Sequence, residues 1–388
     1  MSIADELAEI PLVDQHCHPV VLEEPDREQF ELMLSEAYDP RPVGTSEFDT
    51  QVGLAVRRWC APVLGLQPHV EPDEYLARRS SLGPQESSRR LLRACGTSDL
   101  LVDTGLSVPG MCGLKEQSQL SGAHVHEVVR VETVAERLAA GGVGAEEFGA
   151  ALAAELERRA EGAVGFKTVA AYRVGLDLPA TAPAAAEVRR AADRWLARCE
   201  RTDRYRLDEP ALVAHAVWSC LPFGLPVQVH TGFGDPDLTL HRADPSLLTP
   251  FLRALPAQAP PIVLLHCYPY HRQAACLAAV FPKVALDLSL AVNHVGARAA
   301  AVIAETLELT PFGSLLYGSD GIGLAELHHL GAVLFRRALG QVLEEWVTDD
   351  VLTAVDASRY ARMIAGDNAR RLYRLTPMRE HKRPSQSL

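Results

Sequence analysis

The stretch Pro11-Leu-Val-Asp-Gln-His-Cys-His-Pro19 joins a short apolar run to two histidines that lie one residue apart. On a β-strand, positions i and i+2 point to the same face, so His16 and His18 project side by side from one strand end. Two imidazoles at this spacing can chelate one cation, although a His-x-His pair also occurs by chance. The stretch therefore predicts one corner of a metal site, provided that later strands supply the other ligands.

The composition is that of an ordinary globular protein. Of the 388 residues, 47% are hydrophobic and 23% are charged, and the net charge of −12 argues against nucleic acid or an anionic membrane as a partner. The eight cysteines form no Cys-x-x-Cys pair, which is typical of reduced thiols in a chain of this length. The N-terminus lacks signal-peptide features, and no apolar run is long enough to cross a membrane. We therefore expect a cytoplasmic protein that acts on a small molecule and that can form a homo-oligomer.

Strand-like apolar runs alternate with amphipathic helical segments, which indicates parallel strands joined by crossover helices. Eight such runs occur, at residues 11–16, 100–104, 125–131, 163–170, 226–230, 261–266, 284–288 and 314–320. The first run is not followed by the glycines of a dinucleotide-binding loop, so a Rossmann fold is disfavoured. The pattern predicts an α/β protein with a TIM-like (β/α)8 barrel, in which the chemistry lies where strands end.

Residues 22–94 interrupt this alternation with several helices and proline-rich joints. The segment is too long for a simple crossover, so we interpret it as a helical insertion over the barrel mouth. The barrel then comprises residues 1–21 and 95–375. Residues 376–388 are expected to form a disordered tail.

Ionisable residues close several of the apolar runs. The fifth run ends in His230, the sixth in His266 and the eighth in Asp320, while the fourth carries Lys167. A buried ionisable group is costly unless it is paired or binds a cation. A set of imidazoles and a carboxylate without cysteine suits Zn²⁺, Mn²⁺ or Fe²⁺ and disfavours a purely structural zinc site. We therefore expect these residues to join the two histidines of the first run around a divalent metal.

The order of these residues resembles that of the metal-dependent amidohydrolase superfamily, in its amidohydrolase-related branch. That branch includes the domain fused to glutamine-synthetase-like proteins. The similar stretches are Val-Asp-Gln-His-Cys-His-Pro, Phe-Lys-Thr-Val-Ala-Ala-Tyr-Arg, His-Thr-Gly-Phe-Gly-Asp, Leu-His-Cys-Tyr-Pro, Tyr-Gly-Ser-Asp-Gly and the terminal Gly366-Asp-Asn-Ala-Arg-Arg-Leu-Tyr373. The resemblance spans about residues 10–375 apart from the insertion, and it is more specific for the ligand set than for the substrate.

The resemblance implies four metal-site residues: His16, His18, His230 and Asp320. It implies one or two divalent metals per chain, with zinc as the first choice and manganese or iron as alternatives. His266 is either a ligand of a second metal or a hydrogen-bond donor to the substrate. In binuclear members a carboxylated lysine at the end of the fourth strand bridges two metals, and Lys167 matches that position. The alternative is that Lys167 pairs with a carboxylate or binds substrate.

The implied reaction is hydrolysis of a C–N bond (amide-like, amidine or imine) by a metal-activated water. Asp320 is expected to accept the proton of that water and return it to the leaving group, while His266 helps to polarise the group under attack. Five residues that follow the strands are candidate substrate contacts: Tyr172, Arg173, Tyr268, His271 and Asn293. A guanidinium such as that of Arg173 can clamp a carboxylate, so the substrate is expected to carry one.

Two other functions fit the same residues. A non-hydrolytic lyase of the superfamily, such as a decarboxylase, would use a similar ligand set. Metal content distinguishes the two, because two metals with a carboxylated Lys167 favour the hydrolase. A catalytically inactive binding protein would usually have lost the aspartate of the eighth strand, and Asp320 is present.

Overall fold

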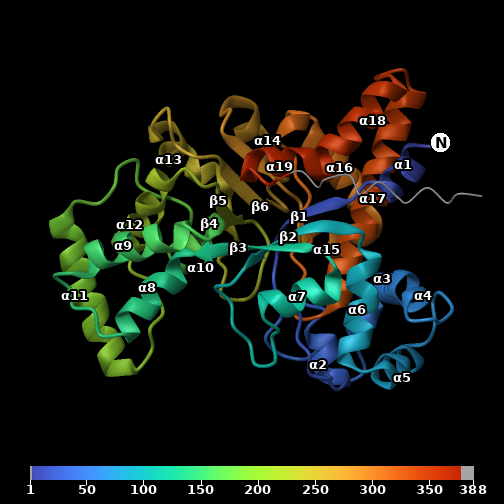
Figure 1. The fold of residues 1–388 in the computed structure, drawn as a ribbon, viewed down its shortest axis with the longest axis horizontal. Helices are drawn as coiled ribbons and strands as arrows, with labels where there is room; N and C mark the ends of the chain where they lie inside the picture. Colours follow the sequence, from blue (N-terminus) through green and yellow to red (C-terminus); the bar gives the residue numbers. More distant parts are fainter. Residues whose placement is uncertain (1, 377–388) are drawn as a thin grey trace, which may run out of the picture.

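A computed structural model describes residues 2–376, and its centre is a curled parallel sheet (Figure 1). The seven strands follow chain order: Leu12–Cys17 (β1), Thr97–Asp103 (β2), His124–Arg130 (β3), Ala163–Thr168 (β4), Val227–Thr231 (β5), Ile262–His266 (β6) and Val284–Leu286 (β7). Every neighbouring pair is parallel, as the alternation of strands and helices predicts. The expected tail lies, from residue 377 onward, outside the described residues.

The predicted eighth strand, at 314–320, forms no regular strand: Ser314 ends a 3-10 helix, Leu315 forms an isolated bridge to Leu286, and the rest has no assigned secondary structure. It nevertheless forms backbone hydrogen bonds with both edge strands of the sheet, β7 and β1. Leu316 N donates to Leu286 O of β7 at 2.9 Å, and Gln15 N of β1 donates to Tyr317 O at 3.0 Å. The prediction of regular strands is therefore confirmed for seven of the eight runs, and the last run bridges β7 and β1 by hydrogen bonds alone.

Helices follow the strands and surround the sheet. In chain order outside the first crossover they are Ile3–Glu9 (α1), Leu114–Ser121 (α7), Val131–Ala140 (α8), Phe148–Ala160 (α9), Ala170–Arg173 (α10), Ala185–Thr202 (α11), Pro210–Cys220 (α12), Thr249–Ala254 (α13), His271–Val280 (α14), Ala291–Val295 (α15), Ala299–Leu307 (α16), Ala325–Thr348 (α17), Ala354–Arg362 (α18) and Asn368–Tyr373 (α19). Helices α8, α9, α11 and α12 gather in a lobe at the left of Figure 1. No described helix is long and apolar enough to cross a membrane.

The crossover from β1 to β2 is largely helical, as predicted. Its helices are Arg27–Leu32 (α2), Gln51–Ala55 (α3), Ala61–Val63 (α4), Pro72–Leu82 (α5) and Pro84–Ala94 (α6), which lie together at the lower right of Figure 1. An ion pair fastens this group to the rest of the protein, because Arg79 Nε of α5 lies 2.9 Å from Glu326 Oε1 of α17. Whether residues 22–94 form a separate inserted unit stays a prediction.

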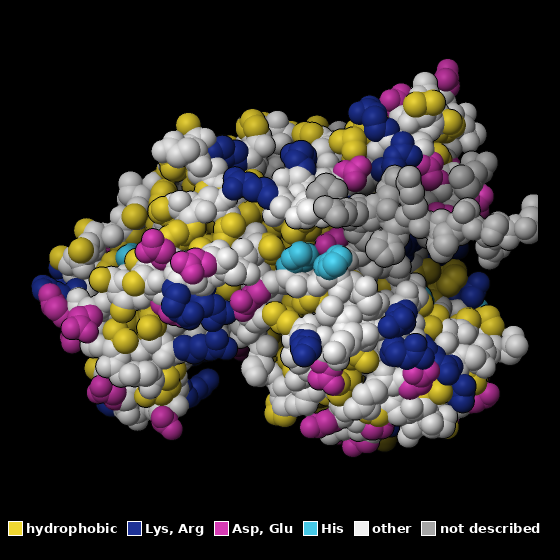
Figure 2. Space-filling view, viewed as in Figure 1, with side chains coloured by type: hydrophobic (Ala, Val, Ile, Leu, Met, Phe, Trp, Pro, Cys, Tyr) yellow, Lys and Arg dark blue, Asp and Glu magenta, His cyan; other side chains and the backbone are white. Residues whose placement is uncertain are grey.

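Alternating strand positions fill one end of the space enclosed by the sheet. Leu101, Val128, Val263 and Leu265 form a buried cluster with Tyr373 of α19. Since parallel strands present side chains in layers, the apolar layer at this end leaves the carboxyl ends of the strands free for polar residues. On the outer face shown in Figure 2, acidic and basic side chains are interspersed.

Candidate metal centre

All six predicted metal-site residues lie at the carboxyl ends of the strands or in the segment that bridges β7 and β1: His16, His18, Lys167, His230, His266 and Asp320. Asp320 is their common neighbour. Its Oδ1 lies 3.0 Å from His16 Nε2 and 3.5 Å from His18 Nε2, and its Oδ2 lies 3.5 Å from His266 Nδ1. Ligand atoms of His16, His18 and Asp320 all lie within 4.8 Å of one another, which suits a single cation.

The backbone of Asp320 is unusual. Its φ of 51° lies in the left-handed region, which aspartate tolerates better than most residues, and its N–H donates to His16 O at 3.0 Å. Burial raises the pKa of the carboxyl, but the surrounding histidines outweigh burial and hold this pKa well below its ordinary value. The carboxylate therefore stays ionised at neutral pH, as a metal ligand or a proton acceptor must.

The tautomer of His16 is fixed by Gln228 of β5. Gln228 Nε2 donates to Gln15 O at 2.6 Å and to Tyr373 Oη at 2.9 Å, so Oε1 is the atom that faces His16 Nδ1 at 2.9 Å. His16 Nδ1 must then carry the proton, which leaves the lone pair of Nε2 directed at the site. The sequence prediction missed Gln228. The available signal was its position two residues before His230, on the same face of a buried strand.

Replacing Gln228 by methionine is expected to lower zinc affinity by about 10–100-fold, because the imidazole of His16 loses the partner that orients it. Gln228→Glu keeps an acceptor for the Nδ1 proton and should retain most of the affinity. Competition against a chromophoric chelator measures both variants, with circular dichroism to check folding. Equal affinities of the methionine variant and the parent protein would contradict the orienting role.

His230 and His266 are both suited to act as neutral imidazoles. Burial lowers the pKa of His230 well below its ordinary value, and burial lowers that of His266 to about 3. His230 Nε2 is buried and has no hydrogen-bond partner within residues 2–376, which fits a metal ligand. His266 Nδ1 lies 2.8 Å from Ser289 Oγ, which in turn donates to Asp287 Oδ1 at 2.8 Å. Ser289, itself bonded to Asp287, therefore fixes the orientation of the His266 ring.

Lys167 lies between the first-strand histidines and β2. Its Nζ is 3.0 Å from His16 Nε2 and 3.9 Å from Asp103 Oδ2, and only 2% of the side chain is exposed. Burial lowers the pKa of Lys167, which favours the neutral amine that carboxylation by CO₂ requires. Arg130 donates to Asp103 Oδ2 through Nε at 3.0 Å and Nη2 at 2.6 Å, so this carboxylate already has a strong partner.

A cavity of about 400 Å³ opens onto these residues, and we call it the metal cavity. His18, Lys167, His230, His266 and Asp320 lie in its wall, together with Glu36 and Tyr38 from the β1–β2 crossover. Tyr172 and Arg173 also line it, as predicted for substrate contacts. Arg173 Nη2 lies 3.1 Å from Glu136 Oε1, and its Nη1 is buried without a partner in the described chain.

The other three predicted substrate contacts do not line this cavity. His271 Nε2 lies 2.8 Å from Glu305 Oε2, and its ring stacks on that of Tyr268 with centroids 5.7 Å apart. The chain turns sharply after β6, where φ is positive at His266 and at the following cysteine, and this turn takes Tyr268 away from the cavity. Asn293 is buried and donates to backbone carbonyls, one of them in the residue before Asp320, so its contacts are structural.

Comparison with known proteins agrees with this arrangement. The sequence profile of the amidohydrolase family matches residues 122–375. The chain belongs to the amidohydrolase family. Protein fluG of Emericella nidulans is 34% identical over 236 residues, which cover 55% of this amidohydrolase and 26% of fluG. The chain thus spans about a quarter of that relative.

Solved structures share the same fold. A protein of Lactobacillus casei, provisionally described as a metal-dependent hydrolase, superposes with a TM-score of 0.85 and 26% identity over 96% of this chain and 97% of that one. Uronate isomerases from Thermotoga maritima (TM-score 0.61, 15% identity, 96% of both chains) and Bacillus halodurans (TM-score 0.64, 14% identity, 96% and 95%) share the fold alone. Membership of the amidohydrolase family suggests an enzyme with a divalent metal, and the imidazole and carboxylate donors described above fit one.

Proposed function

We propose that this amidohydrolase hydrolyses a C–N bond, of the amide, amidine or imine type, in a small molecule that carries a carboxylate. The observation that supports it best is the convergence of three imidazoles on one ionised, largely buried carboxylate in the wall of the metal cavity, with the ring of His230 against that of His266. Zinc is the proposed metal, held by His16, His18, His230 and Asp320. Such a cation supplies an acidified water and polarises the bond to be cleaved.

The residues of the chain then have separate tasks. Asp320 takes the proton of the attacking water and returns it to the departing nitrogen, because it is the ionised group at the centre of the site. His266 donates a hydrogen bond to the polarised oxygen or nitrogen of the substrate, or completes a second metal site. Lys167, once carboxylated, would hold two metals, and the burial that lowers the pKa of its amine favours that reaction. The buried, unpartnered Nη1 of Arg173 supports a role in binding the substrate carboxylate.

Removal of the metal is expected to abolish turnover, and its return to restore it. The protein is dialysed against a chelator, reloaded with zinc, manganese or iron, and assayed against a panel of carboxylate-bearing amides for released amine or ammonia. Release of CO₂ without amine would identify the lyase alternative and contradict hydrolysis. Two metals per chain by elemental analysis, with a carbamate carbon visible by NMR after growth in ¹³C-bicarbonate, would support the bridging role of Lys167, whereas one metal without carbamate would contradict it.

A further inference from the structure

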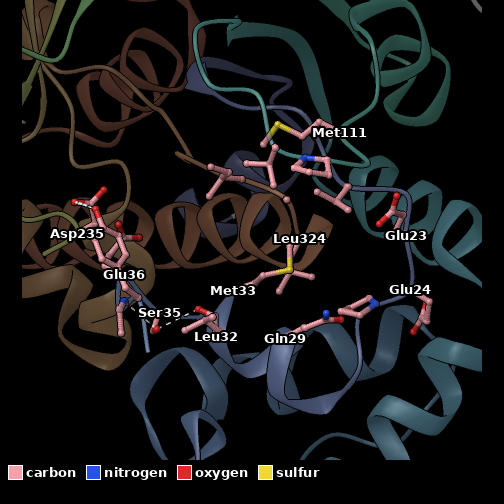
Figure 3. Close-up of a pocket in the computed structure, with 18 of the residues that line it drawn as sticks. Glu23, Glu24, Gln29, Leu32, Met33, Ser35, Glu36, Met111, Asp235 and Leu324 are labelled. Carbon is pink, nitrogen blue, oxygen red and sulfur yellow. Dashed lines mark hydrogen bonds between the residues drawn. The ribbon is translucent and has the colours of Figure 1, made fainter. Parts of the chain in front are cut away.

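A second cavity adjoins the metal cavity, and we call it the side chamber (Figure 3). Its volume is about 530 Å³, larger than that of the metal cavity. The two share four wall residues: Glu36, Tyr38, Asp235 and Ile322. A molecule bound at the metal centre that extends past these residues would therefore enter the side chamber. Together the two spaces exceed what a small carboxylate-bearing amide alone would fill.

The middle of the side chamber is apolar and its two ends are acidic. Figure 3 shows Met33 and Leu324 between two groups of carboxyls, with Asp235 and Glu36 at one end and Glu23 and Glu24 at the other. Methionine side chains adapt to irregular ligands, so such a wall suits a flexible aliphatic chain. Glu24 is paired with Arg79, at 3.0 Å between Oε2 and Nη1, so the far end already holds a cation.

At the end beside the metal cavity, no arginine or lysine of the described chain forms an ion pair with the carboxyl groups. Within the described chain, Glu36 forms no ion pair with an arginine or lysine, and its nearest basic atom is His294 Nε2 at 3.9 Å. Burial lowers the pKa of His294 to about 4, so this imidazole is neutral. Burial, with repulsion from Asp320 and Asp235, raises the pKa of Glu36 to about 8.

Asp235 likewise forms no ion pair with an arginine or lysine of the described chain. Tyr38 Oη donates to Asp235 Oδ1 at 3.0 Å, which satisfies one oxygen and leaves the charge in place. By contrast, the neighbouring Asp237 has its own cation, with Arg206 Nη2 2.9 Å from its Oδ2. Glu36 and Asp235 therefore form an acidic entrance in which neither carboxyl group has an ion pair with an arginine or lysine of the described chain.

We propose that the side chamber binds an apolar arm of the substrate, and that Glu36 and Asp235 bind a protonated amine carried on that arm. An ammonium group offers three N–H donors, enough for both carboxylates, and charge-assisted hydrogen bonds of this kind are the strong ones. The inference rests on the proposed function, since it assigns the side chamber to the molecule that is cleaved at the metal centre. The substrate class is thereby narrowed to elongated, amine-bearing molecules.

Binding of three probes with the same aliphatic chain tests the inference without any turnover. Hexylamine, 1-hexanol and hexanoate are titrated calorimetrically into the metal-loaded protein at pH 9, where Glu36 is ionised and the amine is still protonated. Hexylamine is expected to bind about tenfold or more tightly than 1-hexanol, and hexanoate to bind weakest, because only the ammonium gains a charged hydrogen bond. Glu36→Gln should weaken hexylamine binding several-fold, through loss of one of the two carboxylates, and leave 1-hexanol binding unchanged. Equal binding of amine and alcohol to the parent protein, or no binding of any probe, would overturn the proposal.

A second pair of variants tests the location. Val108 lies on the rim of the side chamber and is 42% exposed, so Val108→Trp can fill the space without disturbing the core. Val108→Trp is expected to lower the binding affinity of all three probes by about tenfold, because apolar contact area in the side chamber is lost. Val43→Trp, at a fully exposed valine outside the side chamber, is the matched control and should change nothing. Undiminished binding to the Val108 variant would place the probes elsewhere and overturn the proposal.

The same titrations on chelated protein separate this inference from the proposed function. Hexylamine should bind equally well without metal, because its partners are carboxylates. Loss of hexylamine binding on chelation would mean that the amine ligates the metal, which overturns the assignment. A protein that follows the expected probe pattern but cleaves no amide would contradict the proposed hydrolysis and still support an amine-binding side chamber.

Discussion

Asp320→Asn is expected to lower kcat by about 10²–10⁴-fold, the range found when a positioned acid–base group is removed. The substitution keeps the size of the side chain and one oxygen, so most of the bound metal should remain. It removes the negative charge on which His16, His18 and His266 converge, and with it the acceptor for the proton of the attacking water. The measurements are steady-state kinetics on an amide substrate found in the panel described above and the zinc content of each preparation.

The exposed Asp349, at the end of α17, offers a matched control for this change. Asp349→Asn makes the same chemical alteration far from the site and should keep full activity. An unchanged kcat in the Asp320 variant would remove this residue from the proton transfer. A loss of zinc in proportion to the loss of activity would instead assign it to metal binding alone.

That the six predicted metal-site residues lie close together could be predicted from the sequence because one rule covers all of them. In a parallel α/β sheet the ends of the strands meet at one face, so an ionisable residue that closes an apolar run belongs there whatever its distance along the chain. This is why His16 and Asp320, about three hundred positions apart in sequence, come within 3.0 Å. The rule also has limits. It predicted a regular strand at 314–320, where the backbone turns left-handed at Asp320 and forms only scattered hydrogen bonds.

Residues that act one layer behind the predicted ligands could not be found in this way. Asp287 and Ser289 carry no signal on their own, and the position of Gln228 two residues before His230 does not reveal that it faces His16, because these roles depend on which strands are neighbours around the sheet. The loop residues Tyr268 and His271 were assigned to the cavity only from their position after β6, and the direction of the turn there decided otherwise. A position after a strand indicates proximity to the site, whereas the backbone conformation of the loop determines which way each side chain points.

Arg79→Met is expected to lower the free energy of unfolding by about 3–5 kcal/mol, the cost of leaving a buried charge without its partner. Arg79 and Glu326 are both buried, with side-chain exposures of 1% and 0%, and Nε lies 2.9 Å from Oε1. Methionine keeps most of the apolar stem but leaves the carboxylate of Glu326 with only the hydroxyl of Tyr75, at 2.9 Å. Urea denaturation followed by tryptophan fluorescence and circular dichroism measures the change.

Two further variants test whether the unpaired charge of Glu326 causes the loss of stability. Arg89 pairs with Glu86 on the surface of α6 at 2.7 Å, so Arg89→Met removes a similar contact in water and should cost less than about 1 kcal/mol. The double variant Arg79→Met/Glu326→Gln removes both charges and should recover a large part of the loss. If the double variant is no more stable than Arg79→Met alone, the cost lies in packing against neighbours such as Phe30 and not in the unpaired carboxylate. A large recovery would show that the loss comes from the unpaired carboxylate of Glu326, and that the β1–β2 crossover stays packed on helix α17 without the ion pair.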